Sequence, residues 1–172
     1  MSALTPDQIA RLLAATVATM RAEVRGLGSE ASWRPAAGEW SVNECVGHLI
    51  ECERRAFAGR IRLILETDRV AFTGWDPAAV AAERHDDEAD PIELVESFAT
   101  LRSEGIALVR SLSPGDLGRV GIHPKIGPLR IDELLGEWVH HDRNHVRQAL
   151  AVTQARVWSQ MGATRRFSEA AD

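Results

Sequence analysis

Four long stretches of this chain place apolar residues at helical spacing, and sequence signals for helix capping precede three of them. The first opens at residues 5–8 (Thr-Pro-Asp-Gln) and the second at residues 41–44 (Ser-Val-Asn-Glu), so each has an N-cap hydroxyl with Gln or Glu three positions later. Asp90, which precedes a proline, marks the start of the third. The sequence predicts helices at about residues 5–26, 42–66, 91–112 and 130–158.

Each of these predicted helices has one apolar face, which is stable only when it packs against another element. Four helices of this length imply an all-α four-helix bundle, and the two longer connections leave room for crossovers. Residues 67–90 form an irregular connection in which the alanines at 78–82 allow a short helix, and no segment has a convincing strand pattern. We expect a single domain over residues 1–172, with its core at about 5–158 and a polar, frayed tail at about 162–172.

Composition and charge argue against several classes of protein. The 172 residues are 45% hydrophobic and 26% charged, which is typical of one soluble globular domain. The net charge of −5 argues against a nucleic-acid partner, which requires a basic surface. The first residues lack the pattern of a signal peptide, and no apolar run approaches the roughly 18 residues that span a bilayer. We therefore expect a cytoplasmic protein with no membrane and no nucleic-acid partner.

Both cysteines, Cys45 and Cys52, fall in the second predicted helix, seven residues apart. Two helical turns separate their α-carbons by about 10 Å, which is too far for a disulfide. We expect reduced thiols, as in a reducing compartment. Thiolate is a good zinc ligand, but buried cysteines more often act as small hydrophobic residues, and we interpret both in that way.

The histidines provide the strongest indication of chemistry. His141 and His145 are four residues apart in the fourth predicted helix and lie within its apolar face, so their side chains point in nearly the same direction. Two imidazoles at this spacing can bind one divalent metal, and His48 from a facing helix would supply a third ligand. The alternative for each is a buried histidine that hydrogen-bonds within the core, because the spacing alone is common.

Three segments occur in a fixed order along the chain: residues 39–44 (Glu-Trp-Ser-Val-Asn-Glu) followed by His48, residues 123–129 (His-Pro-Lys-Ile-Gly-Pro-Leu), and residues 141–148 (His-Asp-Arg-Asn-His-Val-Arg-Gln). Together they resemble the DinB-like (damage-inducible) superfamily, which includes bacillithiol- and mycothiol-dependent S-transferases. The resemblance covers about residues 5–158. The last segment departs from the commonest family ending, His-Arg-Gly-Gln, so the His pair is intact but the subfamily stays open.

This resemblance implies a four-helix bundle that binds one divalent metal ion through His48, His141 and His145. Three imidazoles suit Zn, Ni or Fe, and the sequence does not choose among them. Three protein ligands leave an open position for water or substrate, as in catalytic zinc sites.

The sequence says less about the reaction than about the metal ligands. The resemblance favours a metal-dependent S-transferase that joins a low-molecular-weight thiol to a small-molecule substrate. The alternatives are a metal-dependent hydrolase and a non-catalytic module whose helices are held together by the metal. Glu44, Glu51 and Asp142 are near the histidines in sequence and are candidates for a general base or for orienting the ligands. Bundles of this kind often pair through exposed apolar faces, so we expect that the chain can form a homodimer.

Overall fold

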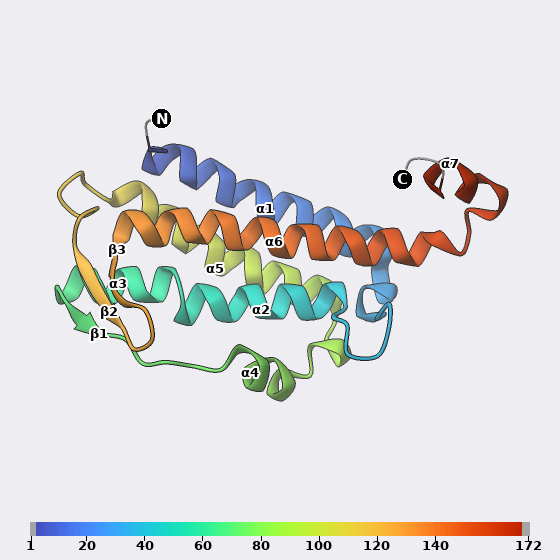
Figure 1. Ribbon diagram of the computed structural model, residues 1–172, viewed down its shortest axis with the longest axis horizontal. Helices are drawn as coiled ribbons and strands as arrows, with labels where there is room; N and C mark the ends of the chain where they lie inside the picture. Colours follow the sequence, from blue (N-terminus) through green and yellow to red (C-terminus); the bar gives the residue numbers. More distant parts are fainter. Residues whose placement is uncertain (1–2, 170–172) are drawn as a thin grey trace.

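Four helices of the computed structural model, which describes residues 3–169, pack as a bundle (Figure 1). They are α1 (Pro6–Leu27), α2 (Val42–Arg55), α5 (Pro91–Ser111) and α6 (Ile131–Trp158). α1 packs against α5 and α6, and α2 packs against the same two helices. The predicted four-helix bundle is confirmed, and α1 and α2 lie diagonally across it.

The helices begin where the capping signals predict. The Thr5 hydroxyl accepts from the Gln8 amide at 3.3 Å, and the Gln8 side chain accepts from the Thr5 amide at 2.8 Å. Ser41 and Glu44 form the same reciprocal pair at the start of α2. Asp90 accepts from two backbone amides of the first turn of α5. Each cap satisfies amides that the helix itself leaves free, which fixes the first residue of the helix.

The predicted helix over 42–66 was wrong in one respect, because it is interrupted. α2 ends at Arg55 and a separate helix, α3 (Ala58–Glu66), follows after Phe57 leaves the helical conformation. A Cβ on Gly59 would lie 1.9 Å from the Arg54 carbonyl oxygen, so this close turn requires glycine. After the break, Ile61 and Ile64 of α3 are buried, whereas Leu63 is 42% exposed.

The connection between α3 and α5 runs back along the bundle (Figure 1). It contains β1 (Val70–Ala71), α4 (Pro77–Arg84) and the 3-10 turn η2 (Asp86–Glu88), so the short helix expected around 78–82 is present. Because the chain returns before α5 begins, α2 and α5 run in the same direction (Figure 1). This is the kind of crossover for which the long connection left room.

A small sheet at one end of the bundle was not predicted. β2 (Val120–His123) and β3 (Gly127–Arg130) form an antiparallel hairpin, and β1 pairs with β2 in parallel. Strands of two to four residues are too short to show the alternation by which strands are recognised. The sheet brings two distant connections of the chain together at this end (Figure 1).

Short elements follow α1 and α6. The 3-10 turn η1 (Gly28–Ser32) follows α1, and η3 (Gly162–Thr164) and α7 (Arg165–Glu169) follow α6. The tail expected to fray is thus helical up to Glu169, although it buries no residue, and its remainder, 170–172, lies outside the described residues. None of the helices between residues 3 and 169 is long and apolar enough to cross a bilayer.

The core contains a buried charge network as well as apolar side chains. Arg102 of α5, fully buried, donates to Glu53 of α2 at 2.7 Å and to Asp142 of α6 at 3.0 Å. Trp138 also donates to Glu53, and Thr16 of α1 donates to Asp142. We call Glu53, Arg102 and Asp142 the buried triad. Through it and Thr16, all four helices of the bundle are joined.

Candidate metal centre

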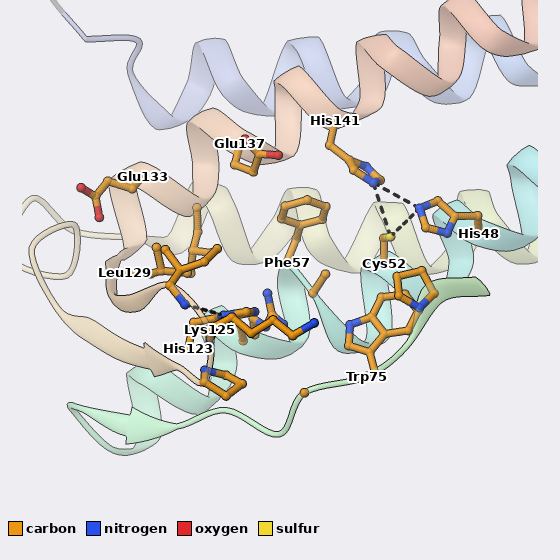
Figure 2. A pocket seen from close by; sticks show the side chains of 17 residues that line it. His48, Cys52, Phe57, Trp75, His123, Lys125, Leu129, Glu133, Glu137 and His141 are labelled. Carbon is orange, nitrogen blue, oxygen red and sulfur yellow. Dashed lines mark hydrogen bonds between the residues drawn. The ribbon is translucent and has the colours of Figure 1, made fainter. Parts of the chain in front are cut away.

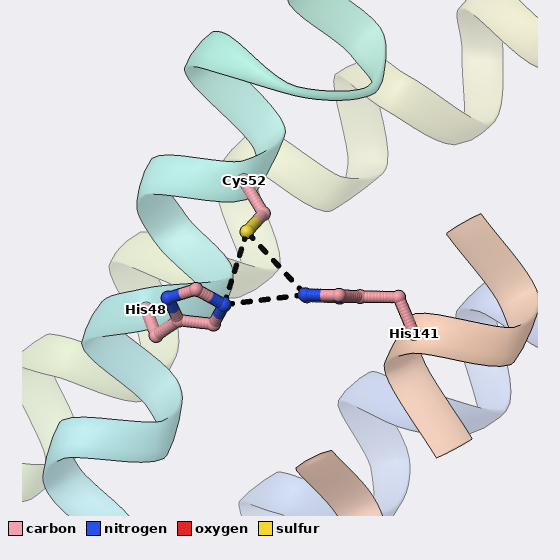
Figure 3. Close-up of side chains that lie close together, drawn as sticks. All are labelled: His48, Cys52 and His141. Carbon is pink, nitrogen blue, oxygen red and sulfur yellow. Dashed lines mark hydrogen bonds between the residues drawn. The ribbon is translucent and has the colours of Figure 1, made fainter. Parts of the chain in front are cut away.

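His48 and His141 meet across the contact between α2 and α6 (Figure 3). Their Nε2 atoms lie 3.2 Å apart, and His48 is only 7% exposed. Two imidazole nitrogens can stay this close only with a proton or a cation between their lone pairs. Packing of the helices therefore presents two nitrogen donors to one point in space.

His145, one turn beyond His141, completes a cluster of three imidazole rings. Its ring centroid lies 4.5 Å from that of His48 and 4.5 Å from that of His141. Its Nδ1 donates to the side-chain oxygen of Gln148 at 3.0 Å, which leaves Nε2 as the lone-pair nitrogen. We call His48, His141 and His145 the histidine cluster; their joint binding of a metal stays a prediction.

Cys52 also faces the cluster, although we had interpreted it as a small hydrophobic residue. Its Sγ lies 3.3 Å from Nε2 of His48 and 3.8 Å from Nε2 of His141 (Figure 3). Cys45, in contrast, is buried in the apolar core. The signal that sequence reasoning passed over is spacing: Cys52 follows His48 by four residues, as His145 follows His141.

These donors fit a divalent transition metal. The donor atoms of His48, Cys52 and His141 all lie within 4.8 Å of one another. Tetrahedral zinc with typical bond lengths separates two nitrogen ligands by about 3.3 Å, and nitrogen from sulfur by about 3.6 Å. The observed separations of 3.2, 3.3 and 3.8 Å are close to those values. Imidazole and thiol donors together suit zinc and related ions better than magnesium or calcium.

Burial keeps the imidazoles neutral, which is the form that binds metal. Desolvation, together with the neighbouring imidazoles, lowers the pKa of His48 to about 3 and that of His141 to about 4. Desolvation also lowers the pKa of His145. Trp40 lies against His48 and His145, and Phe57 packs edge-on to His141, so aromatic rings surround the cluster.

A pocket of about 650 Å³ opens beside the cluster (Figure 2). His48, Cys52 and His141 line one end of it, and the apolar side chains of Phe57 and Trp75 line its walls. Other lining residues come from α3, from the β2–β3 hairpin and from the first turns of α6. The volume is typical of small-molecule sites.

The three carboxylates that we had singled out are engaged elsewhere and do not line this pocket. Glu44 accepts from Ser41 and Arg34, which together hold its pKa below the usual value against the opposing effect of burial. Glu51 is paired with three arginines. Asp142 belongs to the buried triad. Their role as a base or in orienting the ligands stays a prediction, and all three already have strong partners.

Two glutamates that sequence reasoning missed do line the pocket, and both are on α6 (Figure 2). Glu133 accepts from the Arg130 amide in the cap of the helix. Glu137 makes no hydrogen bond or ion pair with any residue in the described part of the chain. It precedes His141 by one helical turn, and that spacing was the available signal.

Comparison with known proteins agrees with this geometry. A model of the DinB superfamily matches residues 12–149, which include all the donors described above. The chain belongs to the DinB superfamily. Its DinB region extends from within α1 into α6, so the family match includes part or all of each of the four bundle helices.

Two relatives within this group carry the same printed name, "Putative metal-dependent hydrolase". The one from Oceanobacillus iheyensis is 26% identical over 153 residues, which are 88% of this chain and 84% of the relative. The one from Bacillus subtilis, YfiT, is 24% identical over 123 residues, 71% of this chain and 68% of the relative. This DinB protein therefore has relatives named for metal dependence, and a His-Cys-His candidate metal site of its own.

The solved structure of Bacillus subtilis YfiT shares the fold. It superposes with a TM-score of 0.80 at 22% identity, and the alignment covers 89% of this chain and 88% of that one. Its title describes a probable metal-dependent hydrolase with an unusual four-helix bundle topology. The crossover before α5 gives this chain an arrangement other than simple up-and-down.

Proposed function

We propose that this protein is a metal-dependent enzyme that hydrolyses a small organic substrate in the pocket beside the histidine cluster. The observation that carries the proposal is the convergence of imidazole donors from two helices at one end of a 650 Å³ pocket. The names of the two relatives support the same reaction class.

The chain supplies distinct groups for such a reaction. A divalent ion held by the histidines would polarise a substrate oxygen and make a water molecule more acidic. Glu137, free of other partners in the described chain, can accept a proton at its carboxylate. Phe57 and Trp75 offer apolar surface for the substrate and limit access of bulk water. Gln148 fixes the orientation of His145.

Thiol S-transfer is the second candidate, and the position of Cys52 favours it. The Cys52 sulfur packs at hydrogen-bonding distance from two imidazoles, so the cluster accommodates a sulfur atom. Burial raises the pKa of this thiol, and only a nearby cation would favour its thiolate. The same cluster can therefore stabilise the thiolate of a low-molecular-weight thiol for attack on an electrophile.

Elemental analysis together with turnover tests the proposal. The wild type, loaded separately with Zn, Ni or Fe, should hold one equivalent of metal, and so should His140→Ala, which changes an exposed histidine beside the cluster. His48→Ala, His141→Ala and His145→Ala should each lose it. Aryl esters and amides test hydrolysis; a haloarene mixed with several thiols tests S-transfer. Metal in all variants would contradict the site, and metal-loaded protein without either activity would contradict the enzyme.

A further inference from the structure

Arg60 of α3 lines the pocket and is partly buried, yet it pairs with no carboxylate among residues 3–169. Its Nε is buried and makes no hydrogen bond within the described chain. Its guanidinium carbon lies 5.2 Å from the centre of the Phe72 ring, so the side chain packs on an aromatic face. The contrast with Arg102 is direct, because that buried arginine has two carboxylates.

A guanidinium removed from water without a carboxylate is unfavourable, and its desolvation appears in the lowered pKa of Arg60. An arrangement of this kind is stable when a ligand supplies the missing charge. Guanidinium is well suited to that function because its parallel N–H groups match the two oxygens of a carboxylate.

Two further donors line the same pocket from the β2–β3 hairpin. Lys125, the only lysine of the chain, extends over the pocket in Figure 2. His123 accepts at Nδ1 from the amides of Lys125 and Ile126, both at 3.2 Å, so its ring proton is on Nε2. Arg60, Lys125 and His123 all line this pocket, and desolvation together with the charges of Arg60 and Lys125 lowers the pKa of His123.

We propose that the substrate carries an anionic group such as a carboxylate, which Arg60 binds with help from Lys125 and His123. This inference rests on the proposed function for the reaction, but not for the binding of the anion. Glu133 and Glu137 line the pocket from α6 and would repel an anion there. The anionic end therefore faces α3 and the hairpin, and the remainder of the substrate extends along the apolar walls toward the histidine cluster.

Binding to the chelator-treated full-length protein tests this without any metal that could itself bind a carboxylate. The probes are benzoate, phenyl phosphate and the neutral isostere benzamide, measured by NMR titration. Benzoate should bind about 10- to 100-fold more weakly to Arg60→Gln than to the wild type, as expected for loss of a charged hydrogen-bonded pair. Benzamide binding should not change. Tighter binding of phenyl phosphate than of benzoate would identify the anion as a phosphate and would still depend on Arg60.

Arg62→Gln is the matched control. Arg62 is on the same helix, two residues later, but it pairs with Glu104 at 3.7 Å and does not line this pocket. Its substitution should leave benzoate binding unchanged. Arg60→Lys, which keeps the charge but loses the fork of donors, should fall between wild type and Arg60→Gln. Equal affinity for benzoate and benzamide in the wild type, or unchanged benzoate binding in a folded Arg60→Gln, would overturn the inference.

Turnover by the metal-loaded protein separates this inference from the proposed function. Phenyl acetate and 4-acetoxybenzoate differ by one carboxylate, and we expect the wild type, but not Arg60→Gln, to prefer the second. If metal-dependent hydrolysis is equally fast for both esters and is unchanged in Arg60→Gln, the inference is wrong and the proposed function still holds. Arg60-dependent benzoate binding without any hydrolysis would support the inference and refute the function.

Discussion

The stability of the protein should depend very differently on the two carboxylates of the buried triad, when each is neutralised in turn. Asp142 accepts from Arg102 through both oxygens and from Thr16, so each of its carboxylate oxygens has a hydrogen-bond partner. Glu53 accepts from Arg102 and Trp138 through one oxygen only, and its other oxygen is buried without a partner. One arginine thus faces two carboxylates, and the one that is half satisfied is the better site for a proton.

The pKa of Glu53 agrees with that assignment. Desolvation raises it to about 7, against the opposing effect of Arg102. Asn at 142 would remove the main counterion of a buried arginine, and breaking such a pair costs about 3–5 kcal/mol. Gln at 53 resembles the protonated acid, so we expect Glu53→Gln to stay within about 1 kcal/mol of the wild type at pH 6. For a domain of this size Asp142→Asn then lowers Tm by roughly 6–20 °C.

The sign of the pH dependence follows from the raised pKa. The folded state holds the Glu53 proton more tightly than the unfolded state, in which the carboxyl has its ordinary pKa of about 4.5. Glu53 therefore costs no stability below that value, and the wild type loses stability as pH rises from about 4.5 through 7. Glu53→Gln cannot lose a proton, so its stability relative to wild type should increase between pH 6 and pH 8.

Urea unfolding followed by circular dichroism, on chelator-treated protein at pH 6 and pH 8, measures both effects without a contribution from bound metal. Equal losses in Asp142→Asn and Glu53→Gln would refute the reasoning. So would a Glu53→Gln variant that becomes less stable relative to wild type as pH rises.

Three further predictions concern the metal centre and the helix break. Cobalt-loaded wild type should show a near-ultraviolet thiolate band that Cys52→Ser loses and Cys45→Ser keeps; a band retained in Cys52→Ser would show that this sulfur is not a ligand. Because the pKa values of His48 and His141 are about 3 and 4, these imidazoles should release no proton on binding metal, so the metal affinity of Cys52→Ser, measured by competition titration, should change little from pH 7 to about pH 5; loss beginning near pH 6.5 would indicate solvated imidazoles. Gly59→Ala should destabilise the protein by about 1–3 kcal/mol in urea unfolding, since its Cβ meets backbone; a neutral effect would mean that the turn relaxes easily.

Local signals in the sequence were sufficient to predict the bundle. The caps at Thr5, Ser41 and Asp90 depend on contacts within three residues, so the chain itself shows where each helix begins. The four-residue spacing of His141 and His145 also survives folding unchanged, because one helix carries both. That His48 lies beside this pair could be predicted only from the family resemblance, because a single sequence does not show which helices face each other.

The features that were missed depend on contacts between distant segments. The break after Arg55 was hidden because apolar spacing continues on both sides of it, and the turn depends on one glycine. Arg60 and Lys125 come together only through the sheet that joins β1 to β2. The place of Cys52 beside the histidines could not be predicted, because a buried thiol has the same sequence pattern whether it packs as a hydrophobic residue or binds metal.

The candidate metal donors and much of the pocket wall belong to different parts of the fold. His48, Cys52 and His141 are on helices of the bundle, whereas Trp75 and Lys125 are on connections between helices. Connections tolerate insertion and replacement far better than packed helices do. Homologues can therefore acquire new substrates by exchanging these segments while they inherit the same reactive centre. Shared histidines are then a sound basis for assigning chemistry to a homologue, but a poor basis for assigning its substrate.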